Sequence, residues 1–362
     1  MDFSDAEMKL RLSKVRELMA AEEVDALYLT GEHNVRYVSG FKGEPRHLWI
    51  TQSEIVLYTG FRTEPWARAQ TADIEISTDA DLLADVARRL ESEGIRTIGV
   101  ERSITHSGFE RIQEKFSTYD VKLSAVVETA RMVKSETEIS YMRTAQKMAE
   151  QVLTDTLPDI RPGVTERFVR GQIRSRIAET EEADDYAFGP LVIFGENAWE
   201  VHHRPDFRKA EEGDLIIIDM GVRYRGYNSD MTRTLCMGTP TDEMRHVYAT
   251  VDQAMDKALD AIHAGQQNHA ADVAARDHIE SAGYGKFFTH GLGHSIGLEV
   301  HDPLLGFGKA TSETTLESGM VMTVEPGIYL EGQFGVRIED TVVVTDNGYE
   351  NLMSFERELI ML

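Results

Sequence analysis

A glycine-rich stretch with three histidines, from Phe287 to Asp302, restricts the fold of this chain most strongly. It reads FFTHGLGHSIGLEVHD and carries imidazoles at His290, His294 and His301. We predict a strand over Phe287–His290 that breaks at the first glycine. Glycine has no Cβ, so it lets backbone and neighbouring side chains approach closely. The three imidazoles are therefore expected near a common point.

Four acidic residues lie at the end of, or within, apolar and β-branched runs elsewhere in the chain. They are Asp219 in LIIIDMG, Asp230 in YNSDMTR, Glu325 in MTVEPG and Glu339 in GVRIED. Short runs of this kind are typical of buried strands. We therefore expect four carboxylates, together with one or more histidines, on strands.

The spacing of the first two acids suggests that they meet. Asp219 and Asp230 are symmetric about the segment Arg223–Gly226. A hairpin that turns there would place the two carboxylates directly opposite each other, with Cβ atoms roughly 4.5–5.5 Å apart. Glu325 and Glu339 are related in the same way, because Gly332 lies midway between them. A loop with an odd number of residues, or a bulge, would bring this second pair together.

Paired carboxylates of this kind suggest a metal centre. Two carboxylates at such a distance repel each other unless a cation lies between them. A set rich in carboxylates with one imidazole suits Mn²⁺, Co²⁺ or Fe²⁺ better than a structural zinc site built from thiolates. Four acids also carry enough charge for two divalent ions.

At these motifs the sequence resembles the proline-specific metallopeptidases of the pita-bread fold. This family includes Xaa-Pro dipeptidase (prolidase) and aminopeptidase P, with methionyl aminopeptidase and creatinase as relatives. The five motifs occur in the family's order over nearly the whole chain, and NVRYVSGF, from Asn34 to Phe41, resembles its first N-terminal motif. The resemblance implies an α+β protein, with an N-terminal creatinase-like α/β domain at residues 1–131. A C-terminal pita-bread domain, a curved antiparallel sheet flanked by helices, would occupy residues 132–362.

The resemblance further implies roles for individual residues. The metal ligands would be Asp219, Asp230, His294, Glu325 and Glu339, with Asp230 and Glu339 bridging the two ions. Glu325, His202 and His301 would be catalytic, and His290 and Arg337 would line the substrate pocket. The expected cofactors are two ions of manganese or cobalt, with iron or zinc as alternatives.

Several of these residues also have simpler interpretations. His290 suits a hydrogen-bonded core histidine equally well, and His202 with His203 suits a solvent-exposed pair. Arg337 alternates with Glu339 along a strand, so an ion pair between them is the simpler alternative.

One segment departs from the family. Its members commonly read Leu-Pro-His before the first catalytic histidine, whereas this chain has Trp199-Glu200-Val201-His202. We expect Trp199 to narrow the substrate pocket or to close it with an aromatic wall. Because of this departure, the sequence identifies the substrate less firmly than the metal site.

The mechanism expected from two ions is hydrolysis. A water that bridges them loses a proton readily, and the ions also polarise the substrate carbonyl. The hydroxide would attack the carbonyl before proline in a short peptide, while Glu325 moves a proton and the histidines stabilise the developing charge. A dipeptide substrate is favoured. The alternatives are an aminopeptidase P, a dimetal hydrolase of a non-peptide C–N bond, and a metal-free relative such as a creatinase-type enzyme or a peptide-binding module.

Composition restricts the partners and the compartment. The formal net charge of −24 argues against nucleic acid and anionic membranes, which need basic patches. We attribute it to solubility, with a salt-rich host as the alternative. The single cysteine, Cys236, excludes an intramolecular disulfide and suits a reducing cytoplasm. No signal-like or membrane-spanning apolar stretch is evident, so a cytoplasmic protein is expected. The family resemblance suggests a homodimer.

Periodicity and capping residues predict most of the regular elements. In the N-terminal part we expect helices and strands to alternate, which indicates an α/β layer structure. Ser135 and Glu138 form a capping box that opens a helix to about residue 157, and further helices begin at Thr165 and Thr241. The remaining predictions are helices at 4–22, 81–93 and 107–116, and strands at 26–30, 47–51, 54–58, 97–100 and 121–124.

Overall fold

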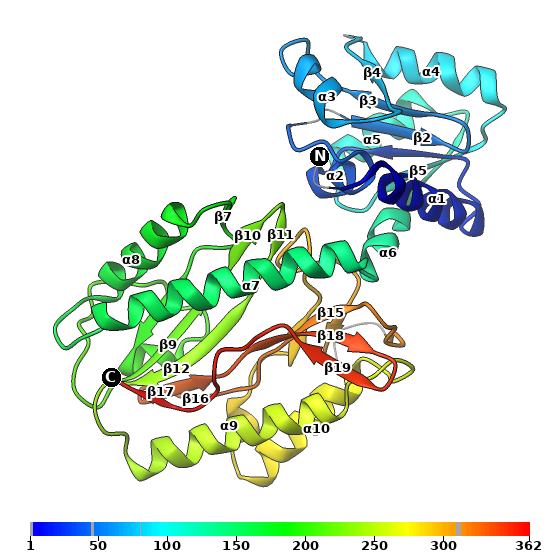
Figure 1. Cartoon of the computed structure of the whole chain (residues 1–362). Helices are drawn as coiled ribbons and strands as arrows, with labels where there is room; N and C mark the ends of the chain where they lie inside the picture. The colour runs from blue at the N-terminus through cyan, green and yellow to red at the C-terminus, as the bar shows by residue number, and fades with distance from the viewer. Residues whose placement is uncertain (1–2, 45–46, 80, 309–312) are drawn as a thin grey trace. The chain divides into compact units, whose positions relative to one another are not determined.

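A computed structural model describes residues 3–44, 47–79, 81–308 and 313–362 of the chain (Figure 1). The chain divides into two compact units, Met1–Arg131 and Met132–Leu362. Each unit has its own buried apolar clusters. In the described part of the chain, no helix combines the length and the apolar character needed to cross a membrane.

The N-terminal unit contains a six-stranded mixed sheet in the order β4-β3-β2-β1-β5-β6. Strands β1, β5 and β6 run parallel, whereas β2 is antiparallel to both β1 and β3. The strands are β1 (Ala26–Leu29), β2 (His47–Thr51), β3 (Ile55–Tyr58), β4 (Glu75–Ser77), β5 (Thr97–Glu101) and β6 (Asp120–Ser124). The helices are α1 (Asp5–Ala21), α2 (Glu32–Ser39), α3 (Glu64–Gln70), α4 (Leu82–Glu93), α5 (His106–Lys115) and α6 (Val126–Met132).

Apolar runs and capping residues account for most helices and strands of this unit. Every residue of β1 and β3 is buried, as expected for short apolar runs covered on both faces. Ser4, Asp81 and Thr105 cap α1, α4 and α5 with side-chain oxygens that accept backbone N–H groups. The predicted α/β alternation is confirmed, with bounds that differ by at most one residue. The short elements α2, α3, α6 and β4 were not predicted.

The C-terminal unit holds two pairs of helices and a set of short sheets between them (Figure 1). Helices α7 (Glu136–Thr156) and α8 (Glu166–Glu179) share one apolar cluster with β8, β9 and β12. Helices α9 (Asp242–Asp260) and α10 (His269–Ser281) share another with β15, β16, β17 and β18. The strands are β7 (Asp185–Tyr186), β8 (Leu191–Phe194), β9 (Leu215–Met220), β10 (Val222–Tyr224), β11 (Tyr227–Asn228), β12 (Met231–Cys236), β13 (Gly293–His294), β14 (Gly306–Phe307), β15 (Val321–Val324), β16 (Gly327–Leu330), β17 (Phe334–Arg337), β18 (Asp340–Thr345), β19 (Gly348–Asn351) and β20 (Ile360–Met361).

The capping signals of this unit are confirmed. The Ser135 side chain accepts from the Glu138 backbone and the Glu138 side chain accepts from the Ser135 backbone, so both halves of the capping box are present. Thr165 and Thr241 cap α8 and α9 in the predicted places. Glu138 also accepts a hydrogen bond of 2.7 Å from the Tyr227 hydroxyl, which joins α7 to β11.

The hairpin that carries the first two acids turns one residue later than predicted. Its turn is Arg225-Gly226, and both residues have positive φ, 48° and 80°, as a type I′ turn requires. Asp219 consequently pairs with Thr232, so the prediction that Asp219 and Asp230 lie directly opposite is wrong. Asp230 immediately precedes β12 and lies diagonally across from Asp219.

The second hairpin follows the prediction. Leu330 pairs with Phe334, which leaves a three-residue loop centred on Gly332 with φ 68°. The ladder continues past Arg337, because Ile338 N donates to Pro326 O at 3.4 Å. Continued by one more residue, the same register places Glu325 opposite Glu339.

The strand predicted over Phe287–His290 is not formed. Gly285–Phe287 is a 3₁₀ turn, and residues 288–290 pair with no strand in the described part of the chain. Its carbonyl groups are bound by a side chain instead: Arg276 of α10 donates to Phe288 O at 2.9 Å and to His290 O at 2.8 Å. Hydrogen bonds from the Arg276 side chain therefore hold this backbone in place of a strand ladder.

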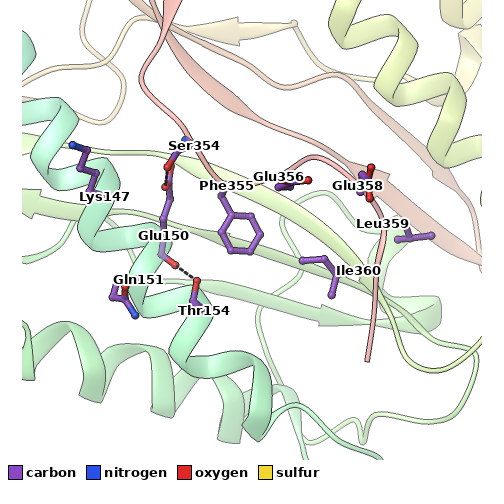
Figure 2. Close-up of a pocket in the computed structure, with 10 residues that line it drawn as sticks. All are labelled: Lys147, Glu150, Gln151, Thr154, Ser354, Phe355, Glu356, Glu358, Leu359 and Ile360. Carbon is purple, nitrogen blue, oxygen red and sulfur yellow. Dashed lines mark hydrogen bonds between the residues drawn. The ribbon is translucent and has the colours of Figure 1, made fainter.

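The C-terminal segment lies along α7. Glu150 of α7 accepts from the backbone and the hydroxyl of Ser354, at 2.7 and 2.5 Å. A cavity of about 680 Å³ lies between this helix and the segment 354–360, with Phe355 and Ile360 on its wall (Figure 2). None of the predicted site residues lines it.

Candidate metal centre

A second cavity, of about 810 Å³, gathers nearly all the predicted site residues. They come from segments that are far apart in the sequence and meet only in the folded C-terminal unit. The cavity is lined by His202, Asp219, Asp230, His290, His294, His301, Glu325, Arg337 and Glu339, together with apolar side chains such as Phe188, Val201 and Phe307. The structure therefore brings together nine of the ten predicted residues.

Backbone pairing fixes the positions of the acids. Asp219 lies within β9, Asp230 directly precedes β12, and Glu325 directly follows β15. Glu339 lies between β17 and β18 and forms an isolated bridge with Thr232. Strand ends hold these carboxylates more rigidly than loops would, because the ladder hydrogen bonds fix the backbone on at least one side.

Hydrogen bonds of Thr232 and Arg337 connect the acidic side chains of the site. The Thr232 hydroxyl donates to Glu339 at 2.7 Å and accepts from Arg337 Nε at 3.1 Å. Arg337 Nη2 also donates to Asp219 Oδ2 at 2.5 Å, and its side chain is only 2% exposed. The alternative ion pair between Arg337 and Glu339 is therefore not the one formed, since the guanidinium binds Asp219.

Two carboxylate oxygens at the centre lack a protein donor. Among the described residues, Asp219 Oδ1 and Asp230 Oδ1 are buried without a hydrogen-bond partner. Buried polar atoms are usually paired, so such oxygens fit the binding of a cation. Burial raises the pKa of Asp230 well above its ordinary value, and the charges of Glu339, Asp219 and Glu325 raise it further. Burial likewise raises the pKa of Glu325 to about 8.

His294 is oriented as a metal ligand. Its Nδ1 lies 3.2 Å from Ser295 O, which assigns the ring proton to Nδ1 and leaves the Nε2 lone pair free. Nε2 lies 3.7 Å from both Asp230 Oδ2 and Glu325 Oε1. That is too long for a hydrogen bond but within reach of ligands that each lie about 2.0–2.2 Å from one ion. Burial lowers the pKa of His294 to about 4, so the imidazole is neutral at pH 7.

The donor set fits divalent metal ions. Asp230, His294 and Glu339 offer ligand atoms that all lie within 4.8 Å of one another. Asp219 and Glu325 add two further carboxylates on the same cavity. Oxygen-rich sites with one imidazole are typical of manganese, cobalt and iron.

Glu166, His203 and Asp206 form another histidine–carboxylate group with the same spacing. Both Glu166 oxygens are already bound by donors, since Oε1 accepts from Phe194 N at 2.8 Å and Oε2 from Asp206 N at 2.9 Å. His203 Nδ1 lies 3.1 Å from Glu200. This group holds the loop that carries His202, and it is a poor candidate for a metal site.

The other histidines differ in their surroundings. His202 and His301 are exposed on the cavity, and the His301 ring lies 3.9 Å from the His294 ring, centroid to centroid. Burial lowers the pKa of His301, although Asp219 opposes the shift. His290 Nε2 lies 2.9 Å from the Tyr329 hydroxyl, and burial together with the charge of Arg337 lowers its pKa to about 4.

Trp199 is the exception among the predicted residues. It does not line the cavity; it ends the 3₁₀ turn Gly195–Trp199 and packs against a cluster that includes Ile217 and Tyr329. Val201 lines the cavity two residues later. The prediction of an aromatic wall finds no support in this placement, because the turn directs the indole to the apolar cluster.

Three residues of the site were missed. Tyr329 joins His290 to Arg337, with 3.2 Å from Arg337 Nη1 to the hydroxyl. Thr232 joins Arg337 to Glu339, and Arg276 holds the backbone at His290. Side chains alternate between the two faces of a strand, so Gly327 and Tyr329 share the face of Glu325 on this hairpin. This pattern could have indicated Tyr329. Arg276 lies on a helix and gave no signal.

Comparison with known proteins now identifies the family. Residues 140–346 match the model of metallopeptidase family M24, and residues 11–133 match the creatinase/prolidase N-terminal domain. The chain belongs to metallopeptidase family M24. The resemblance inferred from the five motifs is confirmed, and so is the α+β class with a creatinase-like N-terminal domain and a pita-bread domain. M24 membership implies divalent metal ions.

Individual M24 relatives match over their full length. A curated Xaa-Pro dipeptidase of Pyrococcus horikoshii is 32% identical, covering 98% of this chain and 99% of the relative. A solved Xaa-Pro dipeptidase from Bacillus anthracis is 33% identical with a TM-score of 0.93, covering 98% of this chain and all of that one. An X-Pro aminopeptidase structure from Thermotoga maritima is 32% identical with a TM-score of 0.86, covering 96% and 100%.

The raised carboxyl pKa values predict how the metal-free protein responds to pH. A raised pKa means that the folded state binds more protons than the unfolded state, so stability falls as pH rises through the folded pKa. Glu325, with its pKa of about 8, changes its protonation between pH 7 and pH 9, and burial also raises the pKa values of Asp230 and Glu339 well above their ordinary range. We expect the melting temperature in chelator to fall by at least about 2–4 °C between pH 7 and pH 9.

Thermal unfolding in chelator and in Mn²⁺ would test this. Bound ions neutralise the carboxylates, so Mn²⁺ should raise the melting temperature more at pH 9 than at pH 7. A metal-free protein whose melting temperature stays constant over this range would contradict the prediction.

Proposed function

We propose that this protein is a dinuclear metal-dependent peptidase that hydrolyses the Xaa-Pro bond of dipeptides. The observation that carries the proposal is the arrangement of four carboxylates and His294 on one cavity, two of the carboxylate oxygens buried without a protein donor. Relatives that cover the whole chain and bear the name Xaa-Pro dipeptidase support the choice of substrate.

Five residues would hold two ions, which we propose to be manganese or cobalt, with iron or zinc as alternatives. They are Asp219, Asp230, His294, Glu325 and Glu339, of which Asp230, His294 and Glu339 have ligand atoms within 4.8 Å of one another. Two divalent ions, when bound, activate a water molecule and polarise the carbonyl before proline. Thr232 and the Ser295 carbonyl orient Glu339 and His294 for this role.

Side chains of the protein would transfer the proton and stabilise the charge that develops on the substrate. The Glu325 carboxylate would accept a proton from the attacking water and deliver it to the proline nitrogen. His301 and His202, both exposed on the cavity, would donate hydrogen bonds to the carbonyl oxygen as charge develops there. Apolar lining residues such as Phe188 and Phe307 would exclude water from the reacting groups.

His290 and Arg337 would bind the proline side of the substrate. Hydrogen bonds to Asp219, Thr232 and Tyr329 fix the Arg337 guanidinium at the cavity wall, where Asp219 offsets part of its positive charge. Such a charge suits the free carboxylate of a dipeptide. The proposal therefore favours dipeptides, although an X-Pro aminopeptidase is also among the similar structures.

We also propose the domain boundaries, the oligomeric state and the compartment that the sequence suggested. Residues 1–131 would form the creatinase-like domain and 132–362 the catalytic domain, in keeping with the two compact units. The protein would act as a homodimer in the cytoplasm, where its single, buried cysteine stays reduced.

Paired substrates test the function directly. The protein is dialysed against chelator, reloaded with Mn²⁺, and given Met-Pro and Met-Pro-Ala in parallel, with the metal-free protein as control. We expect faster cleavage of Met-Pro, and none without metal. Preference for Met-Pro-Ala would make the protein an aminopeptidase P. If metal binds and neither peptide is cut, the peptidase proposal fails and hydrolysis of a non-peptide C–N bond takes its place.

A further inference from the structure

The N-terminal unit contains a cavity of its own, of about 410 Å³. It lies beyond the carboxyl ends of the neighbouring parallel strands β1 and β5. Thr30 follows β1, Ser103 and Thr105 follow β5, and Arg111 projects from α5. Its volume falls in the range of about 300–1,000 Å³ usual for small-molecule sites.

The topology of the sheet makes this a preferred place for a ligand. From β1 the chain adds β2, β3 and β4 toward one edge, then returns to add β5 and β6 toward the other. The order of the strands therefore reverses between β1 and β5. In open α/β sheets, ligands bind outside the carboxyl ends of the strands at such a reversal.

The electrostatics of the cavity favour an anion. Although the chain has a net charge of −24, no carboxylate is among the residues that line the cavity. Arg111 forms no ion pair within the described residues. Helix α5 begins at the same place, and its dipole favours an anion at the N-terminus, although the Gly108 N–H already donates to Thr105 Oγ1.

The nearby Glu101 carries a negative charge that acts on Tyr28, but its oxygens are occupied by protein donors. Its side chain is buried, and Thr30 and Asn34 donate to it at 2.6 and 2.8 Å. The backbone N–H groups of Thr30 and Gly31 donate to it as well. Glu101 is therefore held by protein donors and is not one of the lining residues.

A buried polar side chain gives independent evidence of a ligand. Tyr28 lines the cavity and is only 3% exposed, yet its hydroxyl has no hydrogen-bond partner in the described part of the chain. Its ring stacks on the His47 ring, with centroids 5.0 Å apart and planes inclined by 22°. A phenol hydroxyl that opens onto the cavity, beside a cation and a stacked aromatic wall, suits an oxyanion attached to a planar group.

We propose that this cavity binds a small phosphomonoester. Arg111 and the Tyr28 hydroxyl bind its phosphate near the N-terminus of α5. The stacked pair of Tyr28 and His47 provides the wall for the rest of the molecule. This site is separate from the metal centre and does not depend on the peptidase function.

Binding to the full-length, metal-free protein tests the proposal. Metal is removed first, so that phosphate cannot bind at the carboxylate centre through an ion. Inorganic phosphate and adenosine monophosphate are titrated as probes, and binding is followed by ligand-observed nuclear magnetic resonance. The Arg111→Gln variant should bind at least about tenfold more weakly, because it loses hydrogen bonds to a charged group. Tyr28→Phe should bind more weakly by a smaller factor.

Arg102→Gln is the matched control, because Arg102 is exposed nearby but does not line the cavity. It should retain wild-type affinity. Tighter binding of adenosine monophosphate than of phosphate would support the aromatic wall. Equal affinities of wild type and Arg111→Gln, or no binding of either probe to the wild type, would overturn the proposal.

Discussion

Replacing Asp230 by asparagine should abolish Xaa-Pro hydrolysis, with kcat/KM falling by more than about 10²-fold. Loss of a residue that merely supports a metal ligand already costs about 10–100-fold, and Asp230 would itself bridge both ions. Asparagine keeps the shape of the side chain but removes its charge. Elemental analysis after dialysis against Mn²⁺ should show less bound metal, and Met-Pro hydrolysis measures the activity.

The same variant should not lose stability when metal is absent. Asp230 is 4% exposed, and the charges of Glu339, Asp219 and Glu325 act against its ionised form. Removing that charge relieves repulsion in the metal-free protein. We therefore expect Asp230→Asn to melt in chelator at or above the wild-type temperature, which separates a metal ligand from a residue that supports the fold.

Asp206→Asn is the matched control, since Asp206 belongs to the other histidine–carboxylate group. That variant should keep its metal content. Full metal loading and full activity in Asp230→Asn, or a loss of metal in Asp206→Asn, would show that the ligands have been assigned to the wrong cluster.

The Arg233→Met variant should lose about 3–5 kcal/mol of stability, as expected when one partner of a buried ion pair is removed. The Arg233 and Asp340 side chains are each 1% exposed and lie 2.8 Å apart. Arg233 also donates to the backbone carbonyls of Thr232, Glu339, Phe355 and Glu356. Methionine fills the volume but leaves Asp340 with Asn351 as its remaining side-chain donor.

Denaturant unfolding of the metal-free protein measures this loss. Arg143→Met is the matched control, because the Arg143 and Glu350 side chains are 33% and 47% exposed, and such pairs contribute about 0–1 kcal/mol. Because the two units can unfold separately, the transition of the C-terminal unit should be followed on its own. Similar losses in the two variants would contradict the importance assigned to the buried pair.

The sequence by itself determined the local elements and the chemical character of the site. Apolar runs and capping residues gave α1, α7, α9 and five of the six strands of the N-terminal sheet to within a few residues, because these signals act within one turn or one strand. The midpoint at Gly332 gave the second hairpin, since a short loop fixes the register on both sides. The identity of the acids and histidines gave the metal chemistry.

The tertiary structure decided how those groups meet. Asp219 and Arg337 are 118 residues apart, and their contact depends on two hairpins packing together. Trp199 turned to an apolar cluster, and Arg276 held the backbone where a strand was expected. Such outcomes depend on partners from distant segments, and the short-range preferences of the sequence do not encode them.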